Sequence, residues 1–315
     1  MIAEAQRAVL LAASRNDRLR GLVERAPVTR DLVHRFVAGT GDDEALTATA
    51  DLRGQGLLVT LDRLGEDVRD EADAARTRDA YVGLLGRLSA LGLSDDGDVE
   101  VSVKLSALGQ ALGSGGEQVA LENARTICEA AALAGTTVTL DMEDHSTVDS
   151  TLRVLERLRE EWPWVGAVLQ AQLRRTEADC RDLAGTGSRV RLCKGAYAPP
   201  DAVAFPDPHG TDRSYVRCAK VLLAGDGYPM LATHDPVLLD IAEAVALDVG
   251  RADDAWEVQM LLGVRAQEQA RLAGLGRRVR TYVPYGDDWY AYLVRRLAER
   301  PANLALLLRS LTTTR

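Results

Sequence analysis

Residues Val190-Arg191-Leu192-Cys193-Lys194, followed by Gly195, show the pattern that decides the fold of this chain. A short run of apolar and β-branched residues ends in a polar residue and a glycine, which is typical of a β-strand that meets a loop. From residue 55 onward this pattern occurs eight times, and a longer amphipathic segment follows each run. The repetition predicts strands that alternate with helices.

The eight runs comprise residues 57–61, 99–104, 137–141, 167–173, 190–194, 229–234, 256–261 and 278–283. Strands alternating with helices imply a parallel sheet. Eight units fit an α/β protein of the closed (β/α)8 type, the TIM barrel, which typically needs about 250 residues. An open, doubly wound sheet would also alternate, but eight consecutive units would be many for it.

Two segments flank this repeat. Residues 1–54 are expected to form an N-terminal helical arm, because apolar residues recur at helical spacing on both sides of Pro27. We assign residues 55–315 to the barrel, including a last helix that begins near Trp289 and ends around Pro301. This division predicts one barrel domain with an appended arm.

The composition excludes several classes of function. A net charge of −9 and a pI near 5.1 leave no basic excess to neutralise phosphates, which argues against nucleic acid as a partner. The four cysteines contain no C-x-x-C pair, and the N-terminus resembles no signal peptide. With no apolar span of transmembrane length, we expect a reduced, cytoplasmic compartment.

The chemistry should lie where the strands end, because (β/α)8 barrels place their sites at the C-terminal ends of the strands. Only three lysines occur among the 38 Lys and Arg residues, and two of them, Lys104 and Lys194, end such runs. The other polar candidates at or near strand ends are Asp141, Glu143, His145, Gln170, Gln172, Arg191, Tyr197, Thr233, His234, Asp235, Glu257, Gln259, Arg280 and Tyr282. This set favours the binding of anions and polar rings.

The last helix carries a further candidate pocket. Tyr292, Arg295, Arg296 and Glu299 are three or four residues apart, so they can share one helix face. A surface salt bridge is the simpler interpretation. Neighbouring tyrosines favour instead a walled pocket in which the paired arginines grip a small carboxylate through bidentate hydrogen bonds.

Residue chemistry alone leaves other interpretations open. A metal site is disfavoured because only His145 and His234, of the four histidines, lie near strand ends, and no H-x-H pair occurs. A Schiff-base lysine of the aldolase type would suit Lys104 or Lys194. A barrel that binds a small molecule without catalysis is the third alternative. The glycine-rich segments match neither the Rossmann nor the Walker pattern and are turns.

Several motifs, taken together and in order, resemble the proline dehydrogenase family. They are Val103-Lys104-Leu105-Ser106, Leu140-Asp141-Met142-Glu143, Leu169-Gln170-Ala171, Arg191-Leu192-Cys193-Lys194-Gly195-Ala196-Tyr197, Ala232-Thr233-His234, Gln259-Met260-Leu261-Leu262-Gly263, Tyr282-Val283-Pro284 and Tyr292-Leu293-Val294-Arg295-Arg296-Leu297-Ala298-Glu299. The resemblance implies a distorted barrel and the FAD-dependent oxidation of L-proline to Δ1-pyrroline-5-carboxylate. It also implies a membrane quinone as electron acceptor, hence a peripheral position at the inner face of the cell membrane, and a pyrroline-5-carboxylate dehydrogenase as a downstream partner.

The resemblance also implies residue roles. Arg295 and Arg296 would hold the proline carboxylate, Lys104 would add a third positive charge and Asp141 would lie near Lys104. Tyr197, Leu261, Tyr282 and Tyr292 would wall the substrate ring, Glu299 would close a lid formed by the last helix, and the FAD-binding residues would be Gln170, Arg191, Cys193, Lys194, Gly195, Tyr197, Thr233, His234 and Asp235. No residue stands out as a base for the amine. Cys193, Gln172 and Asp235 depart from the usual Val, Tyr and Asn of the family, which puts the Asp235 contact in doubt.

Overall fold

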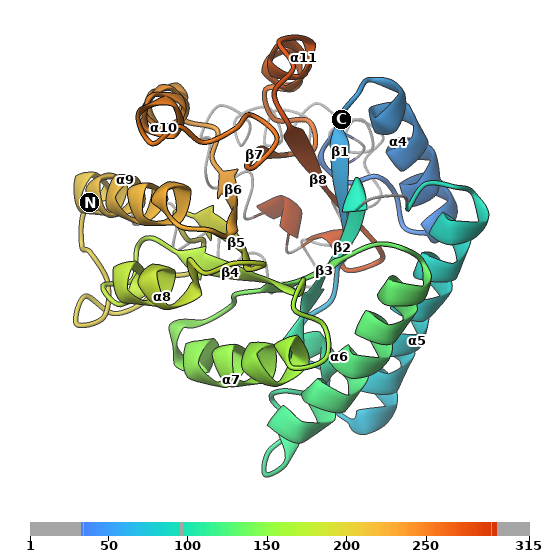
Figure 1. Cartoon of the computed structure of the whole chain (residues 1–315). Helices are drawn as coiled ribbons and strands as arrows, with labels where there is room; N and C mark the ends of the chain where they lie inside the picture. Colours follow the sequence, from blue (N-terminus) through green and yellow to red (C-terminus); the bar gives the residue numbers. More distant parts are fainter. Residues whose placement is uncertain (1–32, 34, 95–96, 291, 295–315) are drawn as a thin grey trace, which may run out of the picture.

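The computed structural model, which describes residues 33, 35–94, 97–290 and 292–294, is a closed barrel of eight parallel strands, with the strands in sequence order around the ring (Figure 1). The predicted (β/α)8 fold is therefore confirmed. The strands are β1 (Leu58–Arg63), β2 (Val99–Lys104), β3 (Val138–Asp141), β4 (Gly166–Gln170), β5 (Arg189–Cys193), β6 (Tyr228–Ala232), β7 (Glu257–Leu261) and β8 (Val279–Tyr285).

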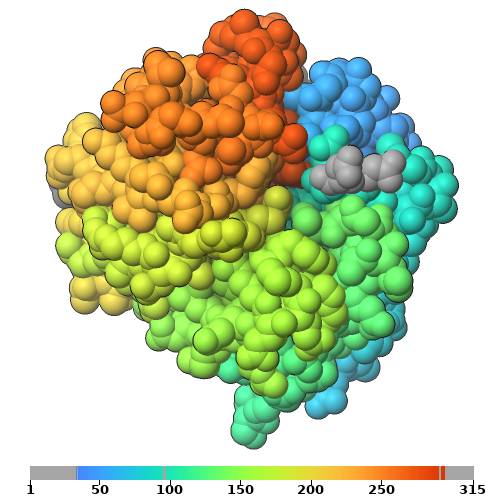
Figure 2. Space-filling view, viewed as in Figure 1, coloured from blue at the N-terminus to red at the C-terminus, as the bar shows by residue number. Residues whose placement is uncertain are grey.

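Helices connect successive strands and surround the barrel, so that each unit lies next to its successor (Figures 1 and 2). Figure 2 shows this order as a progression of colour around the molecule. The helices are α4 (Asp42–Gly54), α5 (Glu71–Ala90), η2 (Leu105–Leu108), α6 (Gly116–Leu133), η3 (His145–Thr147), α7 (Val148–Arg159), α8 (Thr176–Leu183), α9 (Pro208–Ala224), α10 (Pro236–Asp248) and α11 (Ala266–Gly274).

Within each strand, alternate residues face opposite sides of the sheet. In β1, Val59 and Leu61 belong to a large apolar cluster with helices α5 and α6, whereas Thr60 and Asp62 bond to polar groups inside the barrel. Thr60 pairs in register with Glu100 of β2. The sheet thus separates an apolar shell, between strands and helices, from a polar barrel interior.

Aspartates cap the N-termini of three of the α-helices. Asp70 accepts a hydrogen bond from the backbone N–H of Asp73, 2.8 Å away, at the start of α5. Asp207 and Asp235 cap α9 and α10 in the same way, each just before a proline at the first helical position. Carboxylates there satisfy free N–H groups and complement the helix dipole.

The residues just before α4 pack against the end of the barrel. Ala38 N–H donates to the carbonyl of Pro284, and Gly286 N–H donates to that of Gly39, each over 2.9 Å. Phe36 and Val37 share an apolar cluster with the first residues of the last helix, which begins at Trp289 as predicted. The boundary between arm and barrel stays a prediction, because residues 1–32 and 34 lie outside the described part of the chain.

Several strand ends differ from the prediction, among them those of β4 and β8. β4 ends at Gln170, because Leu173 N–H bonds back to the Gln170 carbonyl and turns the chain. β8 continues through Pro284 to Tyr285, because the Tyr285 carbonyl accepts from Leu64 N–H at 2.7 Å. Among the described residues, no helix has the length and apolar character needed to cross a membrane.

Candidate active site

The upper barrel interior, at the C-terminal ends of the strands, is built around Lys104, the last residue of β2. Its ammonium lies 2.7 and 2.8 Å from the two carboxylate oxygens of Asp62 and 3.8 Å from Asp141. Burial alone would lower the pKa of Lys104, but the two carboxylates outweigh burial and raise it. Lys104 is therefore a fixed, charged group whose positive charge is already compensated.

Asp141, the last residue of β3, connects three neighbours. It accepts hydrogen bonds from the Tyr282 hydroxyl at 2.6 Å, from Arg191 Nη1 at 2.8 Å and from the Ser102 hydroxyl at 2.7 Å. Burial, followed by the Asp141 charge, raises the pKa of the Tyr282 phenol, which stays protonated as a donor. The predicted proximity of Asp141 to Lys104 is confirmed.

Arg191 reaches from β5 across the barrel to residues of β1, β2, β3 and β7. Its five N–H groups meet five acceptors, and its guanidinium carbon lies 5.2 Å from the centre of the Tyr282 ring. The acceptors are Gln259 Oε1, Asp141 Oδ1, the hydroxyls of Ser102 and Thr60, and Glu100 Oε1. With 4% of its surface exposed, Arg191 forms the centre of the barrel interior.

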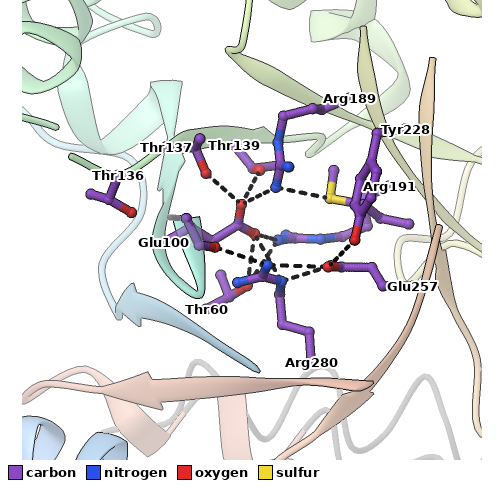
Figure 3. A network of polar contacts seen from close by, with 12 residues as sticks. Thr60, Glu100, Thr136, Thr137, Thr139, Arg189, Arg191, Tyr228, Glu257 and Arg280 are labelled. Atoms are coloured by element: carbon purple, nitrogen blue, oxygen red, sulfur yellow. Dashed lines mark hydrogen bonds and ion pairs between the residues drawn. The ribbon is translucent and has the colours of Figure 1, made fainter. Parts of the chain in front are cut away.

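Below this group lies a second set of charges (Figure 3). Arg280 donates to both oxygens of Glu257, over 2.6 and 3.1 Å, and its Nε lies 4.0 Å from Glu100. Glu257 is the first residue of β7 and Arg280 the second of β8. The prediction that Glu257 and Arg280 lie near the C-terminal ends of their strands was therefore wrong. They belong to the lower half of the barrel interior, where the strands begin.

The ends of β4 and β5 supply a second cluster of predicted residues. The Gln170 side-chain amide donates to the carbonyls of Met142 and Glu143, while its Oε1 is buried without a hydrogen-bond partner among the described residues. Cys193, half-buried, lies 3.5 Å from the Leu169 carbonyl. Gln170 thus presents a free acceptor at the end of the barrel.

Glycine is required at position 195 because the Gln172 side chain lies close to its backbone. Its φ of +114° lies in the region that favours glycine, and an added Cβ would come within 2.3 Å of the Gln172 side chain. Gln172 in turn donates to the Tyr197 carbonyl over 3.3 Å. The loop after β5 therefore folds tightly over the end of β4.

Lys194 lies between two carboxylates, 2.6 Å from Asp212 and 3.1 Å from Asp235. The two acids outweigh partial burial and raise the pKa of Lys194. Asp235 also caps α10, so its carboxylate is held by a helix N-terminus and a lysine together.

The loop after β6 is held to β7. His234 Nε2 accepts from Leu261 N–H at 2.9 Å, so this ring nitrogen is unprotonated, and Thr233 accepts from Asp235 N–H at 3.1 Å. Leu261 is half-buried at the end of β7. The predicted residues Thr233, His234 and Leu261 therefore lie next to one another.

The sequence assigns the remaining predicted residues to the last helix. Tyr292 is buried in the apolar cluster that includes Phe36 and Leu64. Arg295, Arg296 and Glu299 lie outside the described residues. Their assignment therefore stays a prediction.

Sequence reasoning missed one buried acid of the site, Asp62, which follows the apolar run of the first strand, taken to end at Leu61. It placed Glu143 among the strand-end candidates but gave it no role. The Glu143 carboxylate accepts from Ser106, from N–H at 3.1 Å and from the hydroxyl at 2.6 Å. Burial raises the pKa of Glu143 to about 7. Across the described residues, no group of three or more His, Cys, Asp or Glu side chains could hold a metal ion.

A closed parallel barrel whose C-terminal end gathers buried acids, a lysine and an arginine defines a (β/α)8-barrel enzyme. The protein-family model described as proline dehydrogenase matches residues 45–307. The chain belongs to the proline dehydrogenase family, as the motifs predicted.

Individual relatives agree with this assignment. The chain is 39% identical to the proline dehydrogenase of Deinococcus radiodurans over 89% of its own length and 90% of that protein. It is 35% identical to proline dehydrogenase 1 of Bacillus subtilis strain 168, over 97% and 98%. The crystal structure of proline utilization A from Bdellovibrio bacteriovorus, inactivated by N-propargylglycine, matches with a TM-score of 0.80 and 27% identity. That match covers 91% of this chain and 34% of the Bdellovibrio chain.

Proposed function

We propose that this protein oxidises L-proline to Δ1-pyrroline-5-carboxylate, with the hydride passing to FAD and the electrons then to a membrane quinone. The observation that carries the proposal is the family match over residues 45–307, which contains every strand of the barrel and the charged group around Lys104. Use of a quinone implies a peripheral position at the inner face of the cell membrane. The product would pass to a pyrroline-5-carboxylate dehydrogenase.

The residues at the ends of β4 to β6 fit a flavin. The unpartnered Gln170 Oε1 can accept from an imide N–H, and Lys194, held between Asp212 and Asp235, offers an ammonium donor to polar parts of the cofactor. When bound, FAD supplies the hydride acceptor that no amino-acid side chain provides. The residues that we propose to hold it are Gln170, Arg191, Cys193, Lys194, Gly195, Tyr197, Thr233, His234 and Asp235.

The described residues around Asp141 would orient the substrate and exclude water. Tyr282 is fixed by its hydrogen bond to Asp141 and by the Arg191 guanidinium, so its ring can form a rigid wall. Hydride transfer depends on such orientation more than on a strong nucleophile. Tyr197, Leu261 and Tyr292 are proposed to complete the wall.

The proline carboxylate is proposed to bind Arg295 and Arg296, with Glu299 closing the lid. This proposal rests on the sequence of the last helix. Lys104 would act differently from a free third cation, because Asp62 and Asp141 already compensate its charge. We propose that Lys104 holds these two acids in place and contributes a nearly neutral environment to the substrate.

The Schiff-base alternative is disfavoured by the same contacts. A lysine that attacks a carbonyl must lose its proton, which requires a lowered pKa. The pKa values of Lys104 and Lys194 are both raised by adjacent carboxylates. The non-catalytic alternative is disfavoured by membership of an enzyme family.

The test is to purify the protein and record its absorption spectrum, then add L-proline without oxygen. We expect flavin bands near roughly 370 and 450 nm, bleaching of the 450-nm band by proline, and turnover with an artificial electron acceptor. Arg295→Met and Arg296→Met should each raise KM for proline. The expected loss of binding free energy is roughly 2–5 kcal/mol, typical of a lost charged partner. A colourless protein, or one inactivated by borohydride with substrate, would overturn the proposal. Unchanged KM in both variants would remove the carboxylate assignment alone.

A further inference from the structure

Glu100 is a buried carboxylate in the lower barrel interior, one layer below the residues of the proposed site. Its Oε1 lies 2.9 Å from Arg191 Nη2 and accepts from the Thr60 hydroxyl at 2.7 Å, while its Oε2 lies 2.9 Å from Arg189 (Figure 3). Arg280 approaches to 4.0 Å. No part of Glu100 is exposed to solvent.

These contacts keep Glu100 ionised. Burial alone would raise its pKa, but Arg280, Arg189 and Arg191 outweigh burial and lower it to about 2. Glu100 belongs to a connected set in which four cations face four anions. The cations are Lys104, Arg189, Arg191 and Arg280, and the anions are Asp62, Glu100, Asp141 and Glu257.

Arg191 is the member of this set that joins the two layers. One edge of its guanidinium faces Asp141 at the strand ends, and another faces Glu100 below. Gln259 and the hydroxyls of Ser102 and Thr60 bind the remaining N–H groups. The position of Arg191, and the fraction of its charge felt at the strand ends, therefore depend on Glu100 as well as on Asp141.

We propose that Glu100 is a positioning residue for the oxidation reaction: it holds Arg191 from below and compensates part of the charge that Arg191 presents to the hydride acceptor. The inference rests on the proposed function. Among the described residues, replacing the Glu100 carboxylate by a neutral amide leaves Asp141 as the one charged partner of Arg191. Its less compensated positive charge then favours the reduced, more negative form of the flavin.

The test is Glu100→Gln in the flavin-loaded protein. We expect the flavin midpoint potential to become more positive by about 30 mV, which corresponds to a tenfold change in the two-electron equilibrium. We expect kcat for proline to fall about tenfold (about 1.4 kcal/mol), because Arg191 loses the contact that holds it from below. KM should stay within about twofold, because Glu100 is not one of the residues proposed to bind the proline carboxylate. Glu100→Asp, which keeps the charge on a shorter side chain, should give values between the wild type and Glu100→Gln.

Glu257→Gln is the matched control. Glu257 is buried in the same layer and paired with Arg280, but it does not touch Arg191, and the Gln oxygen can still accept from Gln259. This variant should lower stability without moving the flavin potential. Equal potentials in wild type, Glu100→Gln and Glu100→Asp would overturn the inference, as would an equal shift in Glu257→Gln. If the wild type itself neither binds flavin nor oxidises proline, the proposed function fails instead.

Discussion

The two faces of the same sheet differ in chemistry. Outside the barrel, strand residues such as Val101 and Leu140 pack with Leu84 and Ile127 of the surrounding helices in an apolar shell. Inside, charged and polar residues from the same strands form a continuous network of hydrogen bonds and ion pairs. (β/α)8 barrels commonly fill this interior with branched apolar side chains. Here the shell supplies the volume of the core, and the interior supplies the site.

Buried carboxylates also differ from one another. Glu100 and Glu143 are both buried glutamates, yet the pKa of Glu100 is lowered to about 2 and that of Glu143 is raised to about 7. Glu100 lies against arginines, whereas the Glu143 carboxylate accepts hydrogen bonds from the Ser106 hydroxyl and N–H and forms no ion pair with a described residue. Burial is costly for a carboxylate unless cations compensate it. The interior is therefore stabilised by specific ion pairs, whereas the shell is stabilised by the burial of apolar surface.

The largest expected effect is the loss of one interior charge. Glu257→Leu keeps roughly the side-chain volume but removes the carboxylate that binds Arg280 in two places. A buried ion without its partner typically costs about 3–5 kcal/mol, and we expect the free energy of unfolding, measured in urea, to fall by that amount.

A second variant separates charge from packing. Adding Arg280→Met to Glu257→Leu removes the cation that has lost its closest carboxylate, so part of the lost stability should return. The return is partial because Arg280 also donates to the carbonyls of Val59, Asp98 and Gly97 and lies 4.0 Å from Glu100. If the double variant were less stable than Glu257→Leu, pairing would not be what stabilises this layer.

The next largest expected effect is a pH dependence of stability that arises from Glu143. Its pKa is about 7 when folded, against an ordinary 4.5. Between these values the folded protein holds the proton and the unfolded chain has released it, so the stability contributed by this group falls as the pH rises. From pH 5 to 8 we expect a loss of roughly 2–3 kcal/mol.

Glu143→Gln provides the reference, because an amide of the same shape does not titrate. Urea unfolding of both proteins at pH 5 and 8 isolates the Glu143 contribution from all other titrating groups. We expect wild type to lose stability relative to the variant as the pH rises. A difference that stays constant would mean that Glu143 is ionised throughout this range.

The same contrast explains which features the sequence predicted. Runs of apolar and β-branched residues located the strands, because the shell-facing residues recur in every unit. The ion pairs of the interior are harder to predict from the sequence, because they depend on strand register and on which strands lie opposite each other in the ring. Arg191 was predicted to reach the cofactor, but its contacts with Thr60 and Glu100 join strands far apart in sequence. Asp62 was missed because it follows an apolar run and lies beside Lys104 only once β1 and β2 pair.

The smallest effect is expected in the shell. Ile127 of α6 is fully buried among apolar side chains, so Ile127→Val removes one methylene and leaves a small cavity, at a cost of about 0.5–1.5 kcal/mol. The ion pairs across the sheet are untouched, so KM for proline and the flavin potential should equal those of wild type. Urea unfolding measures the loss of stability, steady-state kinetics measure KM, and redox titration measures the flavin potential. A shift in the potential without a matching loss of stability would show that the shell also tunes the interior charges, and the two faces could no longer be treated as independent.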